Sequence, residues 1–204
     1  MVLMEKDIRE SALREQDPLI VPFREERLQG ASYDVCLSGQ LAVFKKGTQT
    51  IDIESCDSLA LYEEYTIEEG YVLEPKEYIL AQLQETLHIP ENWTAHIRPR
   101  TRFTRLGLLV AGQHCNPTYS GQLYIGLFNA SPNAIRIRKN TVIAQVVFEQ
   151  LSGTPQRDKL YENKENAAYM NESGFRGSVL GEQGWTPALK SEYDRLLSLL
   201  DKER

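Results

Sequence analysis

Four arginines fall within eight residues of this chain, in the segment IRPRTRFTRLG: Arg98, Arg100, Arg102 and Arg105. Guanidinium groups form paired hydrogen bonds with phosphate oxygens, and free N–H groups at the start of a short helix would attract the same charge. The cluster predicts a compact phosphate site, suited to a small triphosphate better than to a polymer. The alternative is that these arginines are solvated partners for the surplus acidic residues.

A second group of polar residues lies in QHCNPTYSGQLYIGLFN. His114 and Asn116 are expected on one face of a strand, followed by a proline turn and Tyr119. Side chains that project from a strand into a hairpin are well placed to read a small ligand. The alternative is that His114 is a core histidine with satisfied hydrogen bonds and Asn116 forms an Asx turn before Pro117.

The spacing of the remaining reactive residues excludes several classes of site. The three histidines are never two or four residues apart, and no two cysteines have the spacing of a zinc site, so no protein-bound metal is predicted. The chain also lacks a P-loop, a Gly-x-Gly-x-x-Gly turn and a nucleophile elbow. Those nucleotide-binding and hydrolase folds are therefore excluded.

Composition limits the partners and the location. The chain has 204 residues, enough for one domain with a short appendage. Its net charge of −6 provides no basic field for a nucleic-acid polymer or an anionic membrane. Three cysteines far apart in sequence indicate a reducing compartment, and neither a membrane span nor a signal peptide is visible. We expect a cytoplasmic protein.

Short β-type runs separated by Gly, Pro and Asn fill residues 31 to 151 and predict an all-β sandwich or barrel. Short helices are predicted over 3–13 and within TRFTRLG. After Gly153 a polar arm follows, which we expect to need a partner to order it. The last predicted helix, 186–203, begins with Thr186 as N-cap and Pro187. The predicted strands are SYDVCLS, QLAVFK, YVLEP, EYILAQLQETLHI, WTAHIRP, LGLLVAG, QLYIGLFNAS, AIRIRKN and TVIAQVVFEQL.

Six segments in a fixed order resemble the dCTP deaminase and dUTPase superfamily, and the dCTP deaminase branch most. They are GASYDV, PRTRFTRLGL, the NPTYSG turn, LFN, IAQVVFEQLSG and YENKENAAYMNESGFRGS. The resemblance implies a distorted jelly-roll β-barrel over 1–178, closing arm included. Residues 179–204 lie outside the resemblance and are predicted to form a helical extension. It also implies a homotrimer with sites shared between subunits, a pyrimidine deoxynucleoside triphosphate as ligand, and Mg²⁺ carried by that triphosphate.

The resemblance assigns roles to individual positions. Asp34 matches the acidic member of the first motif, and Arg102 replaces a small residue of the phosphate loop. Tyr119 falls on the aromatic residue that packs against deoxyribose. The implied nucleotide-binding residues are Arg100, Thr101, Arg102 and Arg105 of the phosphate loop, Gln145, Tyr119, and Tyr161, Tyr169 and Phe175 of the arm.

Three positions depart from the family in ways that affect catalysis. Asn116 replaces the aspartate that orients and deprotonates water in dUTPases, and an amide cannot act as a base. Gly126 replaces the general acid/base glutamate of deaminases, and Ala168 replaces an arm lysine. His114 is the candidate substitute base, because its ordinary pKa lies near neutrality.

These departures leave three interpretations. The first is an active enzyme that deaminates dCTP or hydrolyses dUTP with substitute groups. The second is a catalytically silent nucleotide-binding sensor or regulator. The third is an enzyme for a modified pyrimidine nucleotide whose base needs a wider cavity at Gly126. All three share one fold and one pocket, so the fold cannot choose between them.

Overall fold

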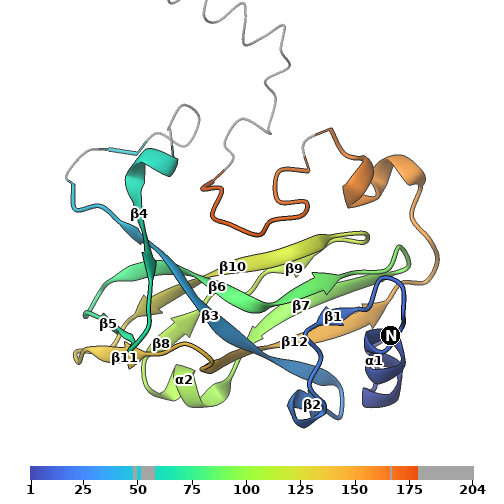
Figure 1. Cartoon of the computed structure of the whole chain (residues 1–204), viewed down its shortest axis with the longest axis horizontal. Helices are drawn as coiled ribbons and strands as arrows, with labels where there is room; N and C mark the ends of the chain where they lie inside the picture. Colours follow the sequence, from blue (N-terminus) through green and yellow to red (C-terminus); the bar gives the residue numbers. More distant parts are fainter. Residues whose placement is uncertain (48–49, 52–57, 166, 179–204) are drawn as a thin grey trace, which may run out of the picture.

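A computed structural model describes residues 1–47, 50–51, 58–165 and 167–178 of the chain. These residues form a strongly curled ten-stranded sheet and a separate two-stranded sheet, with only short helices (Figure 1). The prediction of an all-β fold is confirmed. No helix in the described residues has the length and apolar content to cross a bilayer.

Five long strands form the middle of the sheet: β3 (Ser32–Phe44), β6 (Tyr78–His88), β7 (Trp93–Pro99), β10 (Ser120–Asn129) and β12 (Val142–Gln150). The main path through the sheet is β8-β10-β6-β3-β12-β7-β9. The shorter strands are β1 (Ile20–Val21), β2 (Leu28–Gln29), β4 (Tyr62–Thr66), β5 (Tyr71–Leu73), β8 (Leu108–Val110), β9 (His114–Cys115) and β11 (Ile135–Ile137). The helices are α1 (Glu5–Ala12) and α2 (Thr101–Arg105), with single 3-10 turns at Glu25–Arg27, Leu59–Leu61, Arg157–Lys159 and Tyr161–Asn163.

The core fills the inside of the curled sheet. Apolar side chains from β3, β6, β10 and β12 meet there, and Leu37, Leu83, Ile125 and Phe148 are fully buried. Burial of these side chains provides the main drive for closing the sheet. Helix α1 packs Ile8 onto the same core, so the predicted lead-in helix is confirmed.

The strands differ from the sequence prediction at several places, and the two-residue strands β1 and β2 lie before the predicted β region. SYDVCLS and QLAVFK form one continuous strand, β3, because Gly39 adopts a φ of +99° that allows the strand to bend without ending. Strand β4 was not predicted, because four of its five side chains are exposed and it shows no apolar alternation. It pairs with β3 at the edge of the sheet.

The polar arm from Gly153 to Ser178 folds back over β10 of its own chain (Figure 1). The Asn171 N–H donates to Ser120 O at 2.7 Å, and the Gln122 N–H donates to Glu172 O at 2.7 Å. Gln82 Nε2 donates to Ser173 O at 2.9 Å. The expectation that the arm needs a partner to order it was therefore wrong for the described residues. The helix predicted over 186–203 lies outside them, as does the proposed extension 179–204.

Candidate active site

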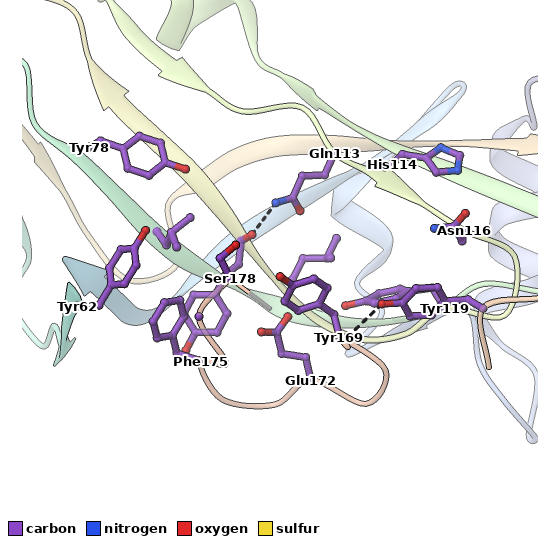
Figure 2. A pocket seen from close by; sticks show the side chains of 15 residues that line it. Tyr62, Tyr78, Gln113, His114, Asn116, Tyr119, Tyr169, Glu172, Phe175 and Ser178 are labelled. Carbon is purple, nitrogen blue, oxygen red and sulfur yellow. Dashed lines mark hydrogen bonds between the residues drawn. The ribbon is translucent and has the colours of Figure 1, made fainter. Parts of the chain in front are cut away.

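A cavity of about 600 Å³ lies between the arm and strands β6 and β10. Its walls are mainly aromatic: the Phe175 ring lies 5.0 Å from that of Tyr62 and 5.3 Å from that of Tyr124. Figure 2 shows these side chains gathered from the sheet and the arm around one space. The lining residues are Tyr62, Tyr78, Leu80, Gln113, His114, Asn116, Tyr119, Leu123, Tyr124, Tyr161, Tyr169, Glu172, Phe175, Gly177 and Ser178.

Six residues singled out from the sequence meet in this cavity: His114, Asn116, Tyr119, Tyr161, Tyr169 and Phe175. His114 belongs to β9 and is exposed, so it is not a core histidine. Asn116 directly follows β9, and the buried Cys115 between them points the other way. The alternation of a strand therefore directs His114 and Asn116 to the same side, as predicted.

Tyr119 forms a buried wall of the cavity. Its side chain is 4% exposed, and its ring lies 5.8 Å from the ring of Tyr161 on the arm. Burial raises the pKa of its phenol, which therefore stays protonated. The Tyr119 Oη atom has no hydrogen-bond partner among the described residues. A buried hydroxyl without a partner is unusual in proteins and indicates a group that awaits a ligand or a water.

Replacing Tyr119 tests this interpretation. We expect Tyr119→Phe to raise the free energy of unfolding of the ligand-free protein by about 1 kcal/mol, because it removes an unsatisfied buried hydroxyl. Tyr124→Phe is the matched control: its Oη accepts a hydrogen bond from the Phe175 N–H, so its loss should lower stability by a similar amount. Urea denaturation of the two variants measures both values. Equal destabilisation by both would contradict the interpretation.

Gln113 provides a fixed hydrogen-bond acceptor. Its Nε2 atom donates to the Tyr124 carbonyl oxygen at 2.8 Å, the dashed line beside Gln113 in Figure 2. A carbonyl oxygen only accepts, so this bond fixes the orientation of the amide. The Gln113 Oε1 atom is buried and has no partner among the described residues. The cavity therefore presents an acceptor to any N–H or O–H group of a ligand.

The space beside Gly126 is already filled. A Cβ atom built on Gly126 would meet the Tyr78 ring and hydroxyl, with the closest approach of 2.4 Å to Oη. Tyr78 comes from the neighbouring strand β6 and lines the cavity (Figure 2). The interpretation that Gly126 widens the cavity for a larger base was therefore wrong. Tyr78 stands where a side chain at position 126 would begin.

The surroundings of His114 favour the uncharged form of its imidazole. Desolvation and the nearby His96, whose ring centre is 5.0 Å away, lower the pKa of His114, while a hydrogen bond with Asn116 acts in the opposite direction. A neutral imidazole can accept a proton. The Asn116 amide cannot, so its available role is to orient His114 or a ligand.

Among the described residues, the lining of the cavity includes one carboxyl group, that of Glu172. This residue was not identified from the sequence. It is 5% exposed, although it lies on the arm. Desolvation raises the pKa of this carboxyl to about 7, against the partial compensation of Arg176 and its backbone N–H. Glu172 can therefore exchange a proton much closer to neutral pH than an ordinary carboxyl group can.

The predicted phosphate residues gather elsewhere, at the ends of β7 and β12. Arg100 forms an ion pair with Asp34, whose side chain is almost buried. Gln145 of β12 lies in register with Asp34 on one side and with Arg98 on the other. Ser32 Oγ donates to Gln145 Oε1 at 3.5 Å. The structure thus brings Asp34, Arg100 and Gln145 together, and the phosphate roles of Arg100 and Gln145 stay predictions.

The other loop residues lie on the surface of α2. Arg102 donates to the Val142 carbonyl oxygen at 3.2 Å, and its guanidinium lies 5.2 Å from the Phe103 ring centre. Thr101 and Arg105 are exposed. None of Arg100, Thr101, Arg102, Arg105 and Gln145 lines the aromatic cavity. In Figure 1, α2 and the arm lie on opposite sides of the curled sheet.

The described residues contain no group of three His, Cys, Asp or Glu side chains arranged to hold a metal ion. The cavity lining likewise includes no Lys or Arg among the residues that the structure places. The cavity is thus an aromatic and hydrogen-bonding site with a single carboxyl, while the positive charge lies in a separate cluster. The aromatic cavity and the arginine cluster are thus two separate surfaces of one chain.

The family model for dCTP deaminase-like domains matches residues 2–151 of the chain. This chain belongs to the dCTP deaminase-like family. Among its relatives, the "dCTP deaminase, dUMP-forming" of Hydrogenobaculum is 30% identical over 156 residues, covering 76% of this chain and 85% of the relative. A dCTP deaminase of Haloarcula marismortui is 30% identical over 189 residues, covering 88% and 95% of the two chains.

A solved structure of the dCTP deaminase of Agrobacterium tumefaciens has the same fold. It superposes with a TM-score of 0.59 at 19% sequence identity, over 72% of this chain. The aligned part is 46% of the longer Agrobacterium chain, so this chain spans about half of that protein. The curled β-barrel fold of that dCTP deaminase therefore extends to this chain.

Proposed function

We propose that this protein binds a pyrimidine deoxynucleoside triphosphate and acts on it as an enzyme, with deamination of dCTP the first candidate and hydrolysis of dUTP the second. The observation that carries the proposal is the aromatic cavity closed by the arm. Its volume of about 600 Å³ is in the range of small-ligand sites. The names of two relatives, "dCTP deaminase, dUMP-forming" and "dCTP deaminase", support the same substrate class.

The cavity suits the nucleoside end of such a ligand. Pyrimidine bases carry N–H donors and a flat apolar face, and the Gln113 Oε1 acceptor and the surrounding rings complement both. Tyr119 is the proposed contact to the sugar, the role that the resemblance implies, and its place in the cavity wall supports this role. Tyr161, Tyr169 and Phe175 would cover the ligand from the arm.

The triphosphate requires positive charge that the cavity lacks. Arg100, Arg105, Thr101 and Gln145 are the proposed phosphate contacts, and they lie outside the cavity of their own chain. We therefore propose that a neighbouring copy supplies them, in a homotrimer whose sites lie between subunits. The substrate is the magnesium complex of the triphosphate, so no protein ligand to the metal is required. A cytoplasmic location belongs to the same proposal.

The alternative is a silent deoxynucleotide sensor, which Asn116 and Gly126 favour because the family's usual proton-transfer groups are absent there. Purified protein incubated with dCTP or dUTP and Mg²⁺, with ammonia and pyrophosphate followed separately, tests both functions. Either product above the level of a protein-free control supports the enzyme. A rise in melting temperature with nucleotide but no product would support the sensor. No shift and no product at millimolar nucleotide would contradict the proposed ligand.

A further inference from the structure

Glu172 is a buried carboxyl on the arm, held in place by backbone pairing. Residues 171 and 172 hydrogen-bond with Ser120 and Gln122 of β10, in both cases at 2.7 Å. A bridge between Gly121 and Glu172 continues this pairing. Figure 2 shows the Glu172 carboxylate between the Tyr169 and Phe175 side chains, directed from the arm into the cavity. The arm therefore positions this group by strand-like contacts.

No salt bridge neutralises Glu172 within the part of the chain that the structure describes. Arg176, the cation that acts on the Glu172 carboxyl, directs its guanidinium to the carbonyl oxygens of Ala168, Met170 and Asn171 at 2.9, 3.0 and 3.4 Å. The Arg176 backbone N–H donates to the Glu172 carboxylate. Buried carboxylates are usually paired with a cation, so an unpaired one that faces a cavity is costly to stability and marks a functional site.

We propose that Glu172 is the proton-transferring catalytic residue of this protein, in place of the glutamate that Gly126 lacks. The inference rests on the proposed function, with dCTP as substrate. The Asn116 side chain is an amide and cannot act as a base. The space at Gly126 is occupied by the phenol of Tyr78. Glu172 is the carboxyl that lines the same cavity.

In the proposed deamination, the Glu172 carboxylate transfers a proton in each of two steps. Glu172 removes a proton from water while the water oxygen forms a bond to C4 of cytosine and the C4=N3 electron pair moves to N3. Glu172 then gives that proton to N3. In the second half it takes the proton of the new C4 hydroxyl and delivers it to the amino group, so that the C4–N bond breaks and ammonia leaves. The products are a uracil nucleotide and ammonia, and Glu172 returns to its ionised form.

The surroundings of Glu172 suit this role. A general acid/base works best when its pKa lies near the working pH, and desolvation raises the pKa of Glu172 to about 7. The groups that face it are two neutral phenols on the β10 side, Tyr119 and Tyr124, whose pKa values are also raised, and the Arg176 cation on the arm, which lowers the pKa of Glu172 in part. The ionised form is required for attack, so turnover should decline as the pH falls below about 7.

The test compares Glu172→Gln with the wild-type protein at several pH values, with dCTP and Mg²⁺ as the probe. Gln has the same shape and can accept the Arg176 N–H but cannot transfer a proton. We expect kcat to fall by about 10²–10⁴-fold with KM changed less than about fivefold, and the acidic limb of the pH profile to disappear. Glu162→Gln, an exposed glutamate on the same arm, should leave kcat unchanged.

The outcomes separate this inference from the proposed function. A Glu172→Gln variant that keeps wild-type kcat and the same pH profile would overturn the role of Glu172 and leave the enzyme intact. Wild-type protein that binds dCTP without releasing ammonia would overturn both the deaminase and this role. Wild-type protein that neither binds nor converts dCTP would overturn the proposed ligand. A loss of kcat with unchanged nucleotide-induced melting shift supports Glu172 as the catalytic group.

Discussion

Arg100→Ala is expected to lower kcat/KM for the triphosphate substrate by about 10²–10³-fold, since hydrogen bonds to a charged group contribute about 1.5–3 kcal/mol each. Asp34 engages the Nη1 atom of Arg100, so Asp34 fixes the guanidinium while its other nitrogens remain able to reach phosphate. The same pairing means that the loss of Arg100 also leaves a nearly buried carboxylate without its cation. Steady-state kinetics at fixed Mg²⁺ measure the first effect.

Two companion variants separate phosphate binding from folding. Arg100→Lys keeps a cation beside Asp34 but loses the paired geometry, so we expect a stable protein with a raised KM. Arg102→Ala should have a much smaller effect, because Arg102 is engaged with the Val142 carbonyl and the Phe103 ring. A stable Arg100→Lys protein with wild-type KM, or an Arg102→Ala variant as impaired as Arg100→Ala, would contradict the assignment.

Glu172→Gln is expected to stabilise the ligand-free protein at alkaline pH. Burial raises the folded-state pKa of Glu172 from 4.5 to about 7, so the folded protein holds a proton that the unfolded chain releases between these values. Stability should therefore fall as pH rises from about 4.5 to about 7, by roughly 3 kcal/mol from this group alone. The Gln variant has no such penalty. Its advantage over wild type should be absent near pH 4 and complete by pH 8.

Urea unfolding of both proteins between pH 4 and pH 8 measures this difference. Glu162→Gln is again the control, since that exposed side chain should shift neither curve. Wild-type and Glu172→Gln curves that stay parallel over the whole range would show that Glu172 titrates normally. In that case its proposed role as an acid/base near neutrality would lose its physical basis.

The sequence predicted most of the fold because its strands carry strong local signals. Apolar β-branched and aromatic runs bounded by Gly, Pro and Asn specify β6, β7, β10 and β12, and TRFTRLG specifies α2. Strand β4 was missed because it is a polar edge strand that exists through pairing with β3. The arm was misread because its order comes from backbone hydrogen bonds to β10, which leave no apolar pattern in the sequence.

The sequence identified several aromatic residues of the candidate site, because the order of the family motifs pointed to Tyr119, Tyr161 and Tyr169. Gln113, Tyr78 and Glu172 were missed, since nothing local marks a glutamine, a tyrosine or an arm glutamate as buried in a shared cavity. One signal could have pointed to Glu172: in the sequence it lies between Tyr169 and Phe175, two arm residues that were predicted to bind the ligand. Register between β6 and β10, which brings Tyr78 beside Gly126, depends on long-range pairing that a single sequence does not reveal.

The most direct measurement tests whether two copies of this chain contribute residues to one nucleotide site. Arg100→Ala and Glu172→Gln subunits, each strongly impaired alone, are mixed by joint refolding, and mixed oligomers are isolated with two affinity tags. Sites formed by the Glu172 cavity of one copy and the arginine cluster of another predict regained dCTP turnover, because some interfaces then combine an intact cavity with an intact Arg100. Mixed oligomers that remain as impaired as their parents would contradict a site shared between subunits.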